Sequence, residues 1–208
     1  MRMVHARRLR GLAPLDPALA RVLVLGSFPS VRSLEKGEYY GHGRNHFWEI
    51  LGAVFGSPVP EEYDARRACL ARAGIAVWDV IASCERDGSL DRDIRAEYSN
   101  PILDFLEARP TILRVALNGG KAADAFVAMI APELARGGGA LAISEERSWA
   151  PPALGGRSLA VARAPSTSPV PTRDYRKAAD KIAAWRKALG REPAAAPAEA
   201  AGASGPPS

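Results

Sequence analysis

The sequence predicts an α/β fold, a three-layer α/β/α arrangement around a mainly parallel, four-stranded central sheet. Four short apolar runs bounded by turn residues recur along the 208-residue chain, and segments with helical spacing lie between them. Such alternation is typical of parallel strands joined by helical crossovers. The runs cover residues 22–25, 75–78, 112–117 and 159–162.

The first run gives the clearest strand. Residues 21–25 (RVLVL) are mostly apolar and β-branched and are closed by Gly26, which fits a strand buried on both faces. Ligands bind parallel sheets at the carboxyl ends of their strands. We therefore expect the next turn, residues 26–30 (GSFPS), to face a ligand, because Gly26 permits a sharp turn and Pro29 fixes its exit.

Helical spacing predicts helices over residues 45–55, 63–73, 101–108, 121–130 and 174–189. The glycine run at 137–139 and the proline pair at 151–152 indicate mobile connections. Beyond about residue 191 the chain is rich in Ala, Pro, Gly and Ser and has little to pack. We expect one domain over residues 1–190 and a disordered tail over residues 191–208.

Aromatic and amide side chains crowd the loop at residues 39–48 (YYGHGRNHFW). Tyr40 and Phe47 offer ring faces, while Asn45 carries both a donor and an acceptor, a mixture that suits a nucleobase. Two structural explanations stay open beside this one. Phe47 and Trp48 also fit the core face of a helix, and Asn45 also fits a helix N-cap.

Composition narrows the class of protein without identifying it. The net charge of +5 permits attraction to phosphate, but the basic residues are scattered. Cys69 and Cys84 are too few for a zinc ribbon or an iron–sulfur cluster, and we expect free thiols in a reducing cytoplasm. The basic N-terminal residues are followed by Pro14 and Asp16, so we expect no signal peptide and no membrane span.

Polar residues follow the other predicted strands. Asp79 either caps the next turn or binds a ring N–H, as an ionised acceptor or as a protonated acid. Asn118 precedes two glycines and fits either a helix cap or a pocket residue. The fourth strand leads into residues 164–169 (APSTSP), which by themselves are ordinary material for a rigid polar loop.

Together the motifs GSFPS, YYGHGRNHFW and APSTSP resemble the uracil-DNA glycosylase superfamily, and most closely its hypoxanthine-DNA glycosylase (DNA-deoxyinosine glycosylase) branch. The resemblance spans about residues 21–185, with the motifs in the family's order. It implies the uracil-DNA glycosylase-like fold. It further implies a monofunctional enzyme that flips a deaminated base, above all hypoxanthine, out of double-stranded DNA and excises it in base excision repair. No metal or organic cofactor is implied.

The resemblance also assigns roles to residues. It places catalysis on Asn45, in the G-x-x-x-N-x-F-W segment. Thymine- and mismatch-specific relatives carry a water-activating Asn or Asp in the first motif, where this chain has Ser27 and Phe28, and this departure argues against uracil excision. The expected base-binding residues are Gly26, Ser27, Phe28, Tyr40, Phe47, Asp79 and Asn118. The expected DNA contacts are Ser30, Ser166, Thr167 and Ser168.

Other functions fit parts of the pattern. A uracil- or xanthine-directed glycosylase would share the carbonyl edge of the base, and a non-catalytic nucleic-acid-binding module would use the same pocket without releasing a base. An α/β hydrolase with Ser27 or Ser30 as nucleophile lacks the G-x-S-x-G elbow and a well-placed histidine. We expect the protein to be a monomer.

Overall fold

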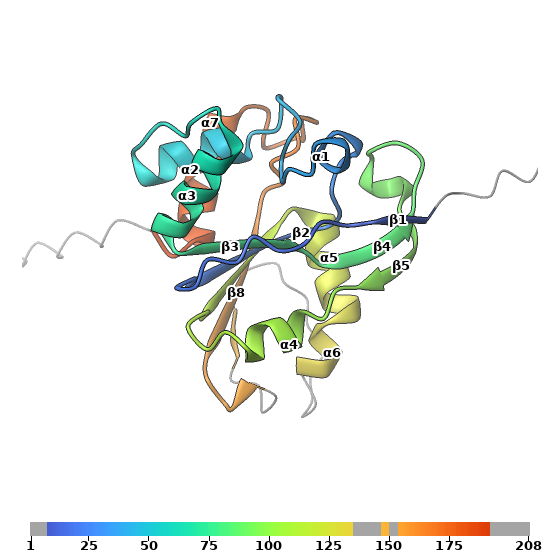
Figure 1. Ribbon diagram of the computed structural model, residues 1–208, viewed down its shortest axis with the longest axis vertical. Coiled ribbons are helices and arrows are strands. Elements are labelled where there is room, and N and C mark those ends of the chain that lie inside the picture. The colour runs from blue at the N-terminus through green and yellow to red at the C-terminus, as the bar shows by residue number, and fades with distance from the viewer. Residues whose placement is uncertain (1–7, 135–146, 150–153, 192–208) are drawn as a thin grey trace, which may run out of the picture.

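The computed structural model describes residues 8–134, 147–149 and 154–191, and its centre is a five-stranded sheet in the order β3-β2-β6-β8-β7 (Figure 1). The strands are β2 (Val22–Gly26), β3 (Ile75–Asp79), β6 (Arg114–Asn118), β7 (Arg147–Trp149) and β8 (Leu159–Ala164). The sequence predicts the four strands that pair in parallel. To these β7 adds an antiparallel edge strand beside β8.

Helices cover both faces of this sheet, which confirms the three-layer arrangement (Figure 1). One side carries α2 (Phe47–Phe55), α3 (Tyr63–Ala73) and α7 (Ala178–Ala188). The other side carries α4 (Ile102–Glu107), α5 (Gly120–Met129) and α6 (Ala131–Leu134). Because both faces of the sheet are covered, Leu23, Val24 and Leu25 are fully buried, as their continuous apolar run predicts.

A second, antiparallel sheet has the order β1-β4-β5 and is not predicted by the sequence. It consists of β1 (Arg8–Arg10), β4 (Ile81–Glu85) and β5 (Arg95–Ser99). Only Val80 separates β3 from β4, so one extended segment contributes to both sheets. The short elements α1 (Val31–Lys36) and η1 (Asp91–Asp93), which precede and follow this segment, are likewise not predicted.

The predicted helices are present; α3 has the predicted bounds of 63–73, and the others begin or end at different residues. The helix predicted from residue 45 begins at Phe47, because Asn45 and His46 belong to the turn before it. The helix predicted from residue 174 begins at Ala178. There the Asp180 carboxylate accepts hydrogen bonds from the backbone N–H groups of Arg176 and Lys177 and so fixes the start of α7.

Several predictions fall on parts of the chain that the structure does not describe. These are the glycine run at 137–139, the proline pair at 151–152 and the tail beyond residue 191. Arg191, predicted to begin the tail, instead packs on the fold: its N–H donates to the carbonyl of Arg186, and its guanidinium lies 5.0 Å from the centre of the Phe55 ring. No helix among the described residues is long and apolar enough to span a membrane.

Candidate active site

The carboxyl ends of three parallel strands and the loop after β8 meet at one edge of the central sheet. Gly26 of β2 lies opposite Asp79 of β3, and Asn118 of β6 lies opposite Ala164 of β8. The sheet register therefore gathers candidate residues that are far apart in the sequence. Ligands of α/β proteins bind at this kind of edge.

Asp79 is a buried carboxyl at this edge. A Cβ at position 26 would overlap its carboxylate oxygen, which explains why glycine stands there. Within the described part of the chain, Oδ2 of Asp79 has no hydrogen-bond partner. Burial raises the pKa of Asp79 to about 8, with a further rise from the charge of Asp91 and an opposing effect of Arg86. Near neutral pH the carboxyl is therefore largely protonated, so it carries both a donor and an acceptor.

Asn118 ties the loop after β8 to the sheet. Its Nδ2 donates to Thr167 Oγ1 at 2.9 Å and to Tyr40 Oη at 3.0 Å, and its Oδ1 accepts from the Thr167 N–H at 2.9 Å. The cap of α5 is Gly119 rather than Asn118. Thr167 is buried and its side chain takes part in this network, while its expected contact with DNA stays a prediction.

Tyr40 covers the face of Phe47. The two rings stack with their centroids 3.8 Å apart and an interplanar angle of 23°. The φ of Tyr40 is 54°, in the left-handed region that non-glycine residues rarely adopt. Since its hydroxyl also accepts from Asn118, the Tyr40 ring fills the space between Phe47 and Asn118. A base can stack on this face of Phe47 only after Tyr40 moves.

Asn45 lines a groove of about 1430 Å³ together with Tyr40, His46 and Pro169. Its Oδ1 accepts from the Phe47 N–H at 3.0 Å in the turn before α2, whose N-cap is His46 rather than Asn45. Its Nδ2 makes no hydrogen bond to any residue that the structure describes. The bond at Oδ1 therefore fixes the orientation of the amide, and Nδ2 has no partner among the described residues.

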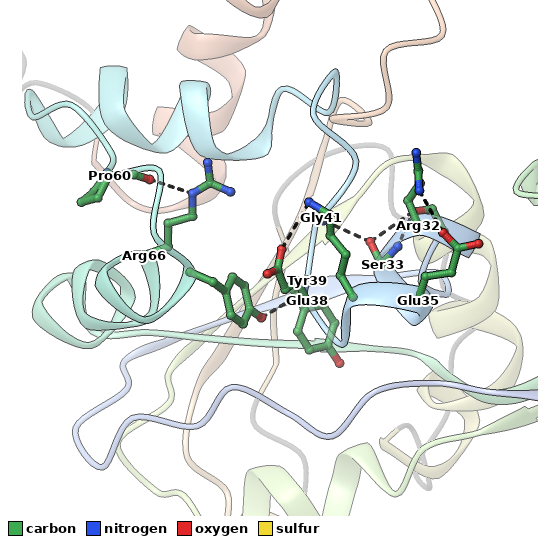
Figure 2. Close-up of polar contacts among 11 residues, drawn as sticks. Arg32, Ser33, Glu35, Glu38, Tyr39, Gly41, Pro60 and Arg66 are labelled. Carbon is green, nitrogen blue, oxygen red and sulfur yellow. Dashed lines mark hydrogen bonds and ion pairs between the residues drawn. The ribbon is translucent and has the colours of Figure 1, made fainter.

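The loop that carries Asn45 is held from both sides (Figure 2). The Gly41 N–H donates to Ser33 Oγ at 3.1 Å, and the Tyr39 N–H donates to Tyr63 Oη at 2.9 Å. Arg66 of α3 donates to the carbonyl of Pro60 at 2.7 Å at the far side of the groove (Figure 2). The groove carries more carboxylates (Glu38, Glu49, Glu61, Glu62 and Asp64) than basic side chains (Lys36, Arg44 and Arg66). This excess of negative charge at the far end of the groove disfavours binding of a phosphate backbone there.

The first-motif side chains make contacts within the protein. Ser27 Oγ donates to Asp91 Oδ1 at 2.7 Å. Phe28 is buried, and the Arg86 guanidinium lies 5.0 Å from its ring centre, so one ring face is already covered. Ser30 Oγ accepts from the Ser33 N–H at 3.2 Å and caps α1. Stacking of Phe28 on a base and contact of Ser30 with DNA stay predictions.

The sequence does not predict a role for Arg86 or Asp91. Both lie in the segment after β4 and form hydrogen bonds to the turn of residues 26–30. Arg86 is buried and donates through Nη2 to the carbonyl of Pro29 at 2.6 Å. In the sequence this segment is polar and rich in charge, which is typical of a surface loop. The described residues contain no group of three or more His, Cys, Asp or Glu side chains placed to hold a metal ion.

The fold and the site together define a class: an α/β protein with amide, carboxyl and aromatic groups gathered at the carboxyl edge of a parallel sheet. The family model described as the uracil DNA glycosylase superfamily matches residues 14–189. The chain belongs to this superfamily, the family of DNA glycosylases that its three motifs predict.

Relatives and a solved structure agree with this assignment. Two proteins named hypoxanthine DNA glycosylase, from Methanosarcina barkeri and Methanosarcina acetivorans, are 33% and 32% identical over 116 residues, which is 55% of this chain and 73% of each relative. A solution NMR structure of a proposed uracil DNA glycosylase from Methanosarcina acetivorans superposes with a TM-score of 0.64 at 26% identity. It covers 88% of this chain and 99% of that one.

Proposed function

We propose that this DNA glycosylase is monofunctional and excises hypoxanthine in base excision repair, by flipping deoxyinosine out of double-stranded DNA and hydrolysing its N-glycosidic bond. The proposal of hypoxanthine as the excised base rests on one observation. The turn after β2 offers no free polar side chain to activate water, because Ser27 is bonded to Asp91 and Phe28 lies under Arg86. The names of the two relatives support the same substrate.

Catalysis in this proposal falls on Asn45. Cleavage leaves positive charge on the sugar and negative charge on the departing base, so it needs positioned donors and a held water rather than a strong nucleophile. Asn45 lines the groove, its Nδ2 is a donor with no partner among the described residues, and the bond from the Phe47 N–H to Oδ1 fixes its direction. The amide either donates to the base or orients the water.

Asp79 and Asn118 read the edge of the base. A neutral Asp79 carboxyl matches the carbonyl and N1–H of hypoxanthine, since it donates with one oxygen and accepts with the other. Gly26 leaves room for this carboxyl. Tyr40 gives up its place on Phe47 when the base enters, and the two rings then supply stacking faces. Uracil and xanthine display a similar edge, so these groups do not discriminate among the three bases.

In this proposal, the loop of residues 166–170 binds the backbone of the DNA strand. Ser166 and Ser168 are half-buried, and each Oγ accepts from a backbone N–H two residues on, which leaves the hydroxyl protons to donate to a phosphate, while Thr167 fixes the loop through Asn118. Val170 is 55% exposed and is the apolar side chain at this position. Apolar side chains of this kind enter base steps in minor-groove complexes, so we assign Val170 to the space beside the flipped nucleotide.

The test uses duplex oligonucleotides that carry hypoxanthine, uracil or xanthine at one site, scored for alkali-labile strand breaks. We expect breaks at hypoxanthine. Binding to the lesion without breaks identifies a non-catalytic module instead, and preference for another base assigns the protein to a different substrate. The proposal includes a monomeric enzyme in the cytoplasm, and the two free thiols, Cys69 and Cys84, fit that reducing compartment.

A further inference from the structure

Lys181 is a buried cation in contact with two loops of the candidate site. It lies in α7, and only 2% of its surface is exposed. Its Nζ donates to the carbonyl of Ser168 at 3.0 Å and lies 3.2 Å from His46 Nδ1. No carboxylate among the described residues forms an ion pair with it, because the neighbouring Asp180 is used to cap the helix.

Packing alone does not explain a lysine at this position. Removal from water disfavours the charged form, and burial lowers the pKa of Lys181. An unbranched apolar side chain such as methionine would fill similar space without desolvating a charge. The contacts with His46 and Ser168 are therefore what distinguishes lysine from an apolar residue here.

The two contacts reach different loops. His46 lies between Asn45 and Phe47, whereas Ser168 lies within the loop of residues 166–170 that is proposed to bind DNA. The same loops are joined directly by a bond from the His46 N–H to the carbonyl of Thr167 at 2.9 Å. Helix α7 holds the start of that segment as well, since Trp185 Nε1 donates to the carbonyl of residue 165 at 3.0 Å. One helix thus anchors both loops.

We propose that Lys181 is a positioning residue for base excision: its ammonium holds His46 against the loop of residues 166–168, so that Asn45 keeps its place relative to the bound strand. This inference rests on the proposed function. Because the ammonium can only donate, His46 Nδ1 accepts, and the ring carries its proton on Nε2. Lys181 therefore also selects one neutral tautomer of His46.

The first experiment measures binding and chemistry separately in the full chain. Lys181→Met removes the ammonium, and Lys187→Met, on the exposed side of the same helix, is the matched control. We expect Lys181→Met to lower the single-turnover excision rate by about tenfold or more, since misplacing a reacting group by about 1 Å can cost a hundredfold. We expect Kd for the inosine duplex to stay within about threefold at one stated salt concentration. Lys187→Met should match the wild type in both.

Two further readouts separate positioning from general loss of stability. The nitrogen NMR shifts of the His46 ring should report the Nε2–H tautomer in the wild type and a mixture in Lys181→Met. His46→Phe combined with Lys181→Met should excise no more slowly than the slower single variant, because the effect of the His46 ring passes through its contact with Lys181, which either substitution removes. If Lys181→Met does not fold, Lys181→Gln, which keeps a donor, is compared with the wild type by the same measurements, with a partial loss of rate expected.

A Lys181 variant that excises at the wild-type rate, or losses that multiply in the double variant, would overturn the inference. An unchanged His46 tautomer in the variant would overturn it as well. A wild-type protein that releases no hypoxanthine contradicts the proposed function instead. The tautomer measurement then still decides whether Lys181 fixes His46.

Discussion

Asn45 shows how one residue can serve both structure and chemistry. Its Oδ1 supports the start of α2 through the Phe47 N–H, and its Nδ2 is left unbonded at the groove. The sequence suggests an N-cap or a catalytic amide for Asn45; the structure makes His46 the N-cap of α2, and Asn45 instead supports the turn before it, while its catalytic role stays a prediction. The bond at Oδ1 is what gives the free Nδ2 a fixed direction.

We predict that Asn45→Ala loses most base excision while still binding inosine-containing DNA. Removal of a positioned donor typically costs about a hundredfold or more in rate. Single-turnover kinetics and a binding titration with the same duplex check this. Excision at wild-type speed would leave Asn45 with a structural role alone.

Asp79 predicts a pH dependence of stability. Its pKa is raised by burial from the ordinary 3.8 to about 8 in the folded protein. Between these values the folded state holds a proton that the unfolded state has lost, so this group stabilises the fold most at low pH, and its contribution falls as the pH rises through 8.

We therefore predict that the free energy of unfolding of the wild type falls between pH 5 and pH 8 by up to about 1.4 kcal/mol per pH unit from this group. Asp79→Asn should remove that part of the slope, whereas Asp124→Asn, on the exposed face of α5, should keep it. Urea titrations at several pH values give the slopes. Equal slopes in the wild type and Asp79→Asn contradict a protonated Asp79.

At the scale of elements, burial decides what the sequence can predict. The four parallel strands are covered on both faces, so each leaves an apolar run. Strand β5 is almost wholly exposed and leaves no alternating pattern, and α1 has only six residues, fewer than two helical turns, so no period can recur. The loop positions depend on close contacts between backbone segments, which leave no periodic pattern in the sequence. At Gly119, for example, φ is 92°, and a Cβ there would lie 2.8 Å from Ser166 Cβ.

We predict that Gly119→Ala destabilises the protein by about 1–3 kcal/mol, because alanine would combine an unfavourable φ with a clash against the Ser166 loop. Gly43→Ala is the matched control, since a Cβ there meets no atom within 4 Å and its φ is not in the left-handed region. Its change in unfolding free energy should stay within about 0.5 kcal/mol. Urea unfolding measures both, and similar losses in the two variants would contradict the account of Gly119.

At the scale of the whole molecule, the sequence predicts which residues meet at the carboxyl edge of the central sheet. It does not predict the distant residues that hold the loops around that edge in place. Asp79 and Asn118 follow predicted strands, and parallel strands bring their carboxyl ends together. Asp91 reaches Ser27 across 64 residues, and Lys181 reaches His46 across 135. Those contacts depend on how loops and helices pack, for which a single sequence holds no periodic signal.

The last residues give a prediction about the chain as a whole. A protein that ends at Arg191 should keep the melting temperature and excision rate of the full chain, because the Ala- and Pro-rich remainder has too little apolar surface to offset the entropy of ordering. Calorimetry and the excision assay compare the two lengths. A melting temperature several degrees lower would show that residues 192–208 form a packed element.

The preference of the protein for hypoxanthine is tested most directly by a single-turnover comparison of inosine- and uracil-containing duplexes. Both lesions are placed in one sequence context at one salt concentration, because binding to either duplex depends on salt. Ser27 donates its hydroxyl proton to Asp91 and Phe28 is apolar and buried, so the first motif lacks the Asn or Asp side chain that activates water in the uracil-directed relatives. We therefore predict that inosine is cut far faster than uracil. Equal or faster release of uracil would contradict the assignment of the base and leave a glycosylase with a different substrate.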